Sequence, residues 1–217
     1  MRKAALLVAA MAALSACQGT IPERDAPPEQ AISAILIGSR FLLPSGETRN
    51  GLTHVGFESG GGRRAEVYRL PLSGGEHFLY LVEPGVYRIA PTRSLFGFYQ
   101  PQMKVVIEER TYQLAFPRDL LRQPPYSVRP TKIMVMGILE ARVMTALPGQ
   151  RPQIRVTLDD SIAARRKLVQ DTIRDMMDPR QASATRESAI TWSRALQNSL
   201  MDILSEEQQR VLYKPAP

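Results

Sequence analysis

Residues 31–158 contain short apolar runs that are separated by clusters of glycine, proline, serine and asparagine. In one run, Phe78 and Tyr80 would face one side of a sheet and Leu79 and Leu81 the other, because successive strand side chains point to opposite faces. The runs cover residues 31–37 with a continuation at 40–43, 52–57, 65–70, 76–82, 86–90, 104–108, 111–116, 132–144 and 153–158. Their close, mostly consecutive spacing predicts a mainly β domain over 31–158, an antiparallel β-sandwich of eight or nine strands.

Two features interrupt this pattern. Gly137 lies inside the longest run and predicts a β-bulge there. Residues 117–130 form a break that contains four prolines, and we expect a loop of this length to be either mobile or functional.

The periodicity changes from that of strands to that of helices after Leu158. Residues 159–161 (Asp-Asp-Ser) predict the cap of a first helix, which ends at Asp178-Pro179. A second helix begins near 183–185, and Ser205-Glu206-Glu207-Gln208 resembles a capping box that opens a last short helical turn. The apolar stripes are Ile162, Val169, Ile173 and Met176 on the first helix and Trp192, Leu196, Leu200 and Ile203 on the second. Residues 159–217 therefore predict a C-terminal helical hairpin and tail, whose stripes are buried against each other or against the sandwich.

The N-terminus carries Arg2-Lys3, an apolar stretch of ten residues (4–13) and then Leu14-Ser15-Ala16-Cys17. This order resembles a bacterial lipoprotein signal, with a lipobox that ends in cysteine. The resemblance implies that residues 1–16 are a signal peptide and that Cys17 carries acyl chains such as palmitate. The alternatives are a secretory signal cut after Ala16 and a transmembrane anchor, although the stretch is about half as long as a membrane-spanning helix.

Cys17 is the only cysteine, so an internal disulfide is excluded. Residues 17–30 then form the lipidated cysteine and a polar, proline-bearing tether. Gln18 stands where an aspartate often retains lipoproteins in the inner membrane, which favours the outer membrane, facing the periplasm. We expect the protein to be held at the membrane by its N-terminal lipid.

The chain of 217 residues has a net charge of +7, and 23 of its 28 basic residues are arginine. This charge favours anionic partners such as phospholipid headgroups or acidic glycans. A GC-rich genome, which favours arginine codons, explains the same bias. The arginines are scattered and the expected location is outside the cytoplasm, so we expect no nucleic-acid partner.

Residues 78–89 read Phe-Leu-Tyr-Leu-Val-Glu-Pro-Gly-Val-Tyr-Arg-Ile. An apolar strand that leads into Pro-Gly-x-Tyr and a further strand resembles an element of prealbumin-like sandwiches, a group with carboxypeptidase regulatory-like domains and several bacterial lipoprotein families. We expect Pro84 to fix φ, Gly85 to adopt a positive φ and Tyr87 to turn its ring inward. The resemblance implies a fold and no activity.

Candidate chemistry is sparse. The chain has two histidines, His54 and His77, and neither a Gly-x-Ser-x-Gly motif nor a His or Cys spacing typical of a metal site. We therefore expect no catalytic residue, metal or cofactor. His77 is expected at the surface, and Met134, Met136 and Met144 in the core. The acidic pairs at 108–109, 159–160 and 206–207 fit a hairpin turn and two helix starts.

Two segments are candidates for contact with a partner. Arg63 and Arg64 follow three glycines and either bind a phosphate or belong to a solvated turn. Phe96, Phe98 and Tyr99 cluster in a predicted loop and form either an exposed apolar patch or a plug of the core.

These features favour a non-enzymatic envelope adaptor or scaffold that docks another envelope protein through a sheet edge, the helical hairpin or the aromatic loop. The alternative is a periplasmic carrier that holds a small lipid or glycan between the sheets or under the hairpin. A hydrolase would need His77, an acid and a serine together in a cleft.

Overall fold

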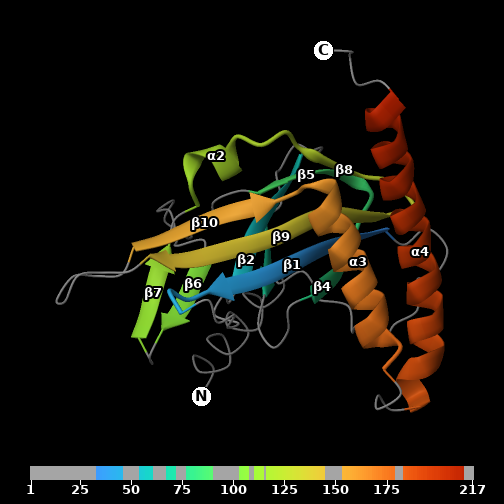
Figure 1. Cartoon of the computed structure of the whole chain (residues 1–217), viewed down its shortest axis with the longest axis horizontal. Helices are drawn as coiled ribbons and strands as arrows, with labels where there is room; N and C mark the ends of the chain where they lie inside the picture. Colours follow the sequence, from blue (N-terminus) through green and yellow to red (C-terminus); the bar gives the residue numbers. More distant parts are fainter. Residues whose placement is uncertain are drawn as a thin grey trace, which may run out of the picture.

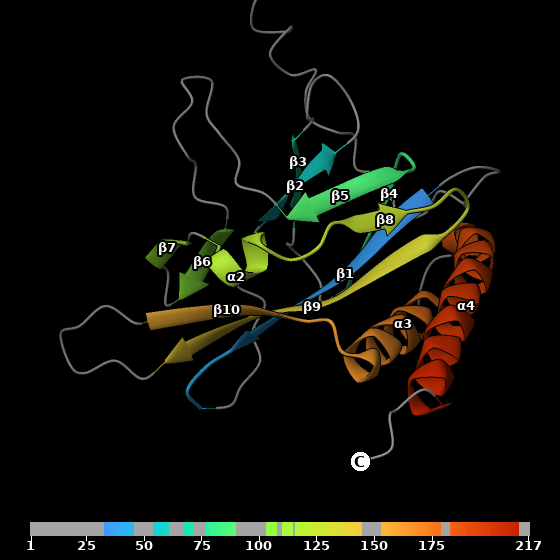
Figure 2. The ribbon, with the colours of Figure 1, turned by 90° about the horizontal axis from the view of Figure 1, so that it is seen from above.

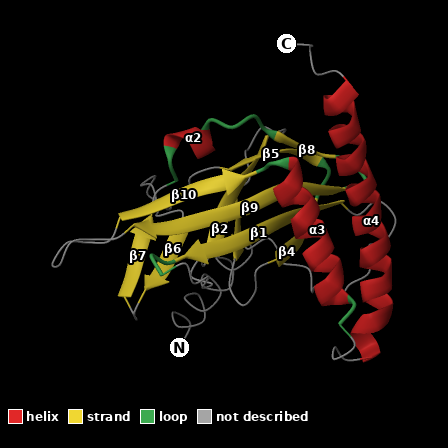
Figure 3. Ribbon diagram, viewed as in Figure 1, coloured by secondary structure: helices red, strands yellow, loops and turns green. Residues whose placement is uncertain are grey.

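A computed structural model describes residues 33–45, 54–60, 67–71, 77–89, 103–107, 110–114, 116–144, 153–178 and 183–212. This part of the chain is a mixed α+β structure of small sheets and a C-terminal pair of packed helices (Figure 1). The predicted helical hairpin is thereby confirmed, whereas helices contribute more than a mainly β prediction implies (Figure 3).

The first sheet has the strand order β10-β9-β1-β4. Its strands are β1 (Ser33–Leu42), β4 (His77–Val82), β9 (Ile133–Met144) and β10 (Gln153–Asp159). The β1–β4 and β9–β10 pairs are antiparallel, but β1 and β9 are parallel. The prediction of an antiparallel arrangement is therefore wrong for this central pair. A parallel pair needs a long crossover connection, which the alternation within each strand does not encode.

The second sheet has the order β3-β2-β5-β8 and is antiparallel throughout. Its strands are β2 (His54–Gly60), β3 (Val67–Pro71), β5 (Gly85–Ile89) and β8 (Tyr126–Val128). A separate hairpin joins β6 (Met103–Ile107) to β7 (Arg110–Leu114), as the sequence predicts. The break at 117–130 contains the short helix α2 (Arg118–Leu121) and β8, so its prediction as a loop without structure is wrong.

Two apolar cores divide the described residues into three layers. The first core lies between the sheets and includes Ile35, Phe41, Phe57 and Leu139, none of which is more than 1% exposed. The second core lies between the first sheet and the helices. It joins the alternate side chains of the same strands to the helical stripes. Figure 2 shows the second sheet and the helical pair on opposite sides of the first sheet.

The helical pair consists of α3 (Ile162–Met176) and α4 (Ser183–Leu212). The Ser161 hydroxyl accepts a hydrogen bond from the Ala164 amide at 3.2 Å and caps α3, as predicted. Five residues of the predicted stripes are buried, namely Val169, Met176, Trp192, Leu196 and Ile203. Leu168 of α3 is also buried in this core, although the predicted stripe did not include it.

α4 continues without a break through 205–208, so the predicted capping box is wrong. Glu206 and Glu207 lie inside the helix and form ion pairs with Arg165 and Arg166 of α3, at 2.7 and 3.2 Å. These carboxylates pair across the helical hairpin instead of capping a new helix.

Gly137 forms the predicted bulge. The β1–β9 register advances from Leu36–Val135 to Ile37–Gly137, so β9 carries one extra residue. Gly137 has φ +123° and is the only glycine with positive φ in the described ranges. A Cβ atom at this position would collide with the backbone of Asp159 and Asp160. The bulge therefore lets the end of β10 lie against β9.

The Pro84–Tyr87 element carries the chain from the first sheet to the second. The expectation of positive φ at Gly85 is wrong, because this residue opens β5 with an ordinary strand conformation. The inward ring of Tyr87 is confirmed, since the residue is 2% exposed within the core between the sheets. Its hydroxyl donates to the Glu83 carbonyl at 2.7 Å and fixes the corner.

Candidate functional site

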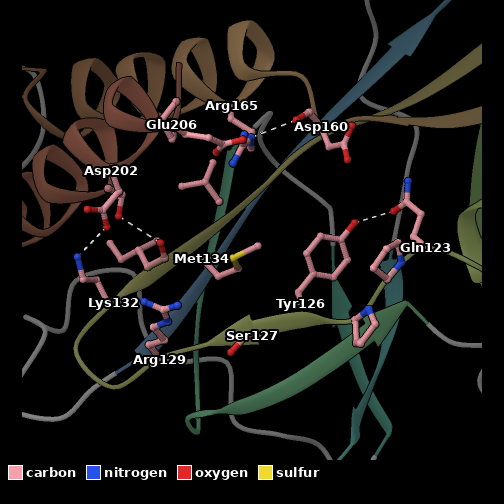
Figure 4. Close-up of a pocket in the computed structure, with 16 residues that line it drawn as sticks. Gln123, Tyr126, Ser127, Arg129, Lys132, Met134, Asp160, Arg165, Asp202 and Glu206 are labelled. Carbon is pink, nitrogen blue, oxygen red and sulfur yellow. Dashed lines mark hydrogen bonds and ion pairs between the residues drawn. The ribbon is translucent and has the colours of Figure 1, made fainter. Parts of the chain in front are cut away.

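The junction of the helical pair with β8 and the start of β9 is hollowed into a cleft of about 520 Å³ (Figure 4). We call it the charged cleft. Its apolar lining includes Ile133, Met134, Val135 and Ile203. Its charged lining consists of Arg129, Lys132, Asp160, Arg165, Asp202 and Glu206. Three cations and three anions therefore surround an apolar surface.

Two ion pairs lie along the helical wall of the charged cleft. Lys132 Nζ lies 2.7 Å from Asp202 Oδ2 and connects the start of β9 to α4. Arg165, with a side chain only 17% exposed, lies 2.7 Å from Glu206 Oε2 and donates from Nε to the Asp160 carbonyl at 3.1 Å. The Lys132 pair is exposed and contributes little, so α4 is fixed against the sheet mainly by the second core and by the buried hydrogen bond from Ser199 Oγ to the Ile133 carbonyl at 3.2 Å.

Arg129 differs from the other charged residues of the cleft. Its carbonyl accepts hydrogen bonds from Ser33 Oγ at 2.9 Å and from the Lys132 amide at 3.3 Å, which fixes the turn before β9. Within this turn Thr131 has φ 58°, a region that β-branched residues rarely adopt. The exposed Arg129 guanidinium is the one cation of the cleft without an ion pair to any described residue.

Tyr126 supplies the wall opposite the helices. Its hydroxyl donates to Gln123 Oε1 at 2.6 Å (Figure 4), and the prolines at 124–125 line the same cleft. Burial, with a smaller effect of the negative charge of Asp160, raises the pKa of the Tyr126 phenol to about 12. The Tyr126 phenol therefore stays a neutral hydrogen-bonding group well above the pH at which an exposed tyrosine ionises.

A second hollow of about 540 Å³ runs along β10, and we call it the edge groove. Residues 153–158 of β10 form one wall, and the α2 segment, with Pro117, Asp119 and Leu120, contributes the other. Figure 1 shows α2 beyond β10, at the edge of the first sheet. Among the residues that the structure describes, Gln123 alone lines both the edge groove and the charged cleft.

The lipidation and contact residues that the sequence singled out are not among those described as lining the two hollows. Cys17 and the contact candidates Arg63, Arg64, Phe96, Phe98 and Tyr99 lie outside the described residues. Their roles stay predictions. The hollows draw their residues from distant segments, and the break at 117–130, which we expected to be either mobile or functional, contributes to both of them.

Two further expectations are corrected. His77 is not a free surface residue, because its Nδ1 lies 2.8 Å from Asp175 Oδ2 of α3 and its side chain is 12% exposed. Met144 is 46% exposed and lines the edge groove, whereas Met136 is buried in the core as predicted. The even-numbered residues of β9 face the core between the sheets before the bulge, and the odd-numbered residues face it after the bulge. Met144 therefore faces away from this core, which the alternation of the sequence alone does not predict.

Among the described residues, no group of three histidine, cysteine or acidic side chains is arranged to hold a metal ion. In the same part of the chain, no helix combines the length and the apolar character needed to cross a membrane. Comparison of the chain with protein-family models, curated protein sequences and solved structures gives no match.

Proposed function

We propose that the protein is a bacterial envelope lipoprotein that acts as a non-enzymatic adaptor and docks a protein partner in the charged cleft. The observation that carries this proposal is the pattern of the cleft: an apolar surface bordered by charges, with an aromatic ring and one unpaired arginine. Protein interfaces have this anatomy, with an apolar centre, a polar rim and enrichment in tyrosine and arginine.

The membrane anchor is the acylated Cys17, and the compartment is the periplasmic side of the outer membrane. The support is the lipobox at 14–17 and the tether at 18–30. A single acyl chain binds membranes only reversibly, so stable anchoring requires the multiple chains of a lipoprotein cysteine.

We also propose a prealbumin-like sandwich for the two-sheet body. The support is the corner at 83–87, where the chain changes sheets and the Tyr87 hydroxyl closes onto the Glu83 carbonyl. The helical pair is an addition to this body and creates one wall of the charged cleft.

A small ligand is the second candidate for the cleft. Its volume of about 520 Å³ falls within the range of small-molecule sites. The charged lining suits a polar glycan better than a lipid tail, because an acyl chain gains nothing from ionic neighbours. Native mass spectrometry of the protein extracted in detergent tests this candidate, and a bound molecule of constant mass would favour the carrier over the adaptor.

Photocrosslinking in intact cells tests the adaptor. A photoreactive residue at Ser127, which is exposed within the cleft, should give a protein adduct of discrete mass. The same residue at exposed Gln170 of α3, outside both hollows, is the matched control. Loss of the adduct in Arg129→Glu would support docking at the cleft. Identical adducts from both positions, or none from Ser127, would contradict it.

The anchor is tested separately with Cys17→Ser. The wild-type chain should incorporate labelled palmitate and sediment with membranes, and the variant should do neither. Equal labelling and equal fractionation of the two chains would refute the anchor without bearing on the cleft.

A further inference from the structure

β10 is the outer strand of the first sheet. Its residues Gln153–Asp159 pair with β9 on one side, and its other side has no strand partner among the described residues. The outward N–H and C=O groups of such an edge form a row of hydrogen-bonding sites with the repeat of another strand. Proteins commonly blunt these edges with proline or with short strands, whereas β10 is seven residues long and contains no proline.

The edge groove lies along this free backbone edge. Six consecutive residues of β10 line it, and the α2 segment forms its far wall. A pocket for a compact ligand would draw on a few side chains from several strands. A groove that follows one strand residue by residue matches an extended peptide backbone, which binds by adding a strand.

The side chains of β10 define which peptide fits. Ile154, Val156 and Leu158 turn toward the core between the sheets, where Leu120 of α2 is also buried. An added strand would place every second side chain in line with these residues, since the faces of neighbouring strands coincide. Those positions of the peptide should be apolar.

The opposite face of β10 is exposed and carries Arg155 near its middle. Its one carboxylate, Asp159 at the end of the strand, already accepts a hydrogen bond from the Ser161 amide at 3.1 Å. Arg155 stands in register with Arg142 of β9, whose side chain is 57% exposed. Glu140 is the nearby carboxylate, and it is already shared between Arg142 at 2.9 Å and Arg40 at 2.6 Å. Burial opposes ionisation of Glu140, but the hydrogen bonds from the two arginines lower its pKa overall. The arginines therefore retain an excess of positive charge, which an acidic side chain of the peptide would neutralise.

We propose that the edge groove binds an extended peptide segment of a partner protein, which adds a strand to β10 and alternates apolar with acidic side chains. The groove is a second docking site, distinct from the charged cleft, and does not require the membrane anchor. A protein with both sites would hold two partner segments at once.

The test uses the full-length protein in detergent and a synthetic peptide of alternating valine and glutamate, matched in length to residues 153–158. Hydrogen exchange should show protection of the β10 amides when this peptide is added. A peptide with the same composition, in which all valines precede all glutamates, is the matched control and should give no protection.

The charge and backbone requirements are tested by affinity, measured as fluorescence anisotropy. Arg155→Glu should weaken binding of the glutamate peptide about fivefold and favour a lysine counterpart, as expected for a cross-strand charge pair. Arg174→Glu, on α3 with a side chain 75% exposed, should change neither affinity. Two further peptides carry N-methyl groups on the odd-numbered or on the even-numbered amides. Only one edge of the peptide faces β10, so one of these two peptides should lose binding and the other should keep it.

Absence of β10 protection, equal binding of the block peptide or equal binding of both methylated peptides would overturn the proposal. Protection of β10 through dimerisation without any peptide would also overturn it, because a second copy would then occupy the edge. None of these results alters the crosslinking test of the charged cleft, so the two proposals fail separately.

Discussion

Replacing Gly137 by alanine places a methyl group where the backbone of the β10–α3 junction already lies. The new Cβ would stand 2.9 Å from Asp160 Cα and closer still to the Asp159 carbonyl oxygen. Both neighbours are backbone atoms, which cannot move aside as the end of a side chain can. The substitution also forces alanine into φ +123°, a conformation that L-residues rarely adopt.

The two effects add. An unfavourable backbone conformation of this kind costs about 1–3 kcal/mol, and overpacking costs about 1–3 kcal/mol more. We therefore expect Gly137→Ala to lower the free energy of unfolding by at least about 2 kcal/mol. For a protein of this size a loss of about 2 kcal/mol corresponds to a fall in Tm of about 4–8 °C, and a larger loss to a larger fall.

Two other glycines supply a graded control. At Gly85 a Cβ would meet Tyr87 Cε2 at 3.6 Å, an ordinary contact, so Gly85→Ala should change stability by less than about 1 kcal/mol. At Gly38 it would approach Leu168 Cδ1 at 3.0 Å and Ile138 Cγ1 at 3.1 Å, which are side-chain atoms that can shift. Gly38→Ala should fall between the other two variants.

Urea denaturation followed by circular dichroism measures all three, with an unchanged m-value as the check that the unfolding reaction is the same. The reasoning is refuted if Gly137→Ala unfolds at the same urea concentration as Gly85→Ala. In that case the bulge would tolerate a side chain, and the close approach of β10 to β9 would not be what requires glycine.

Three further results are expected. Leu196→Ala should lower the free energy of unfolding by about 2–5 kcal/mol in the same denaturation assay, because Leu196 is fully buried between α4 and the first sheet; a loss below 1 kcal/mol, roughly that of a surface site, would contradict this packing. Arg165→Ala should lower the free energy of unfolding by about 1.5–3 kcal/mol, because it removes the partly buried ion pair with Glu206. Arg166→Ala removes a more exposed ion pair and should lower it by less than about 1 kcal/mol; equal losses for the two variants would argue against burial as the cause of the difference. The Tyr126 phenol should ionise near pH 12 in a near-ultraviolet absorbance titration, and Tyr126→Phe should remove that step. Because folding raises this pKa, the contribution of the phenol to stability should be complete below about pH 10 and lost as the pH rises through 12. Ionisation at the ordinary value near 10 would show that the ring is solvated.

The existence of most strands, and the bounds of β9 and β10, follow from local patterns. The predicted runs at 132–144 and 153–158 correspond to β9 and β10 within one residue at each end. Alternation of apolar residues and flanking turn residues are properties of the strand itself, so a single sequence contains them. β8 was missed because it has three residues in a proline-rich stretch, and it becomes a strand through pairing with β5.

Pairing and site assembly depend on contacts between distant segments. No pattern in β1 indicates that its neighbour is β9 in a parallel orientation. In the same way, residues 205–208 satisfy the sequence rule for a helix start. In the structure they lie inside the uninterrupted helix α4, where Glu206 forms an ion pair with Arg165 of α3. The charged cleft combines residues of three separate segments, none of which has a motif of its own.

The central position of β1 sets the order of events during synthesis. β1 is the first of the described strands to be translated. Its neighbour β9 follows about a hundred residues later, and the paired residues Arg40 and Glu140 are 100 positions apart. Such a high contact order slows folding, because the entropy of closing a long loop is lost before the contacts between the two strands form. A nascent chain that ends before Ile133 lacks β9, the strand between β1 and β10, so the first sheet can be completed only after the second half of the chain has been synthesised.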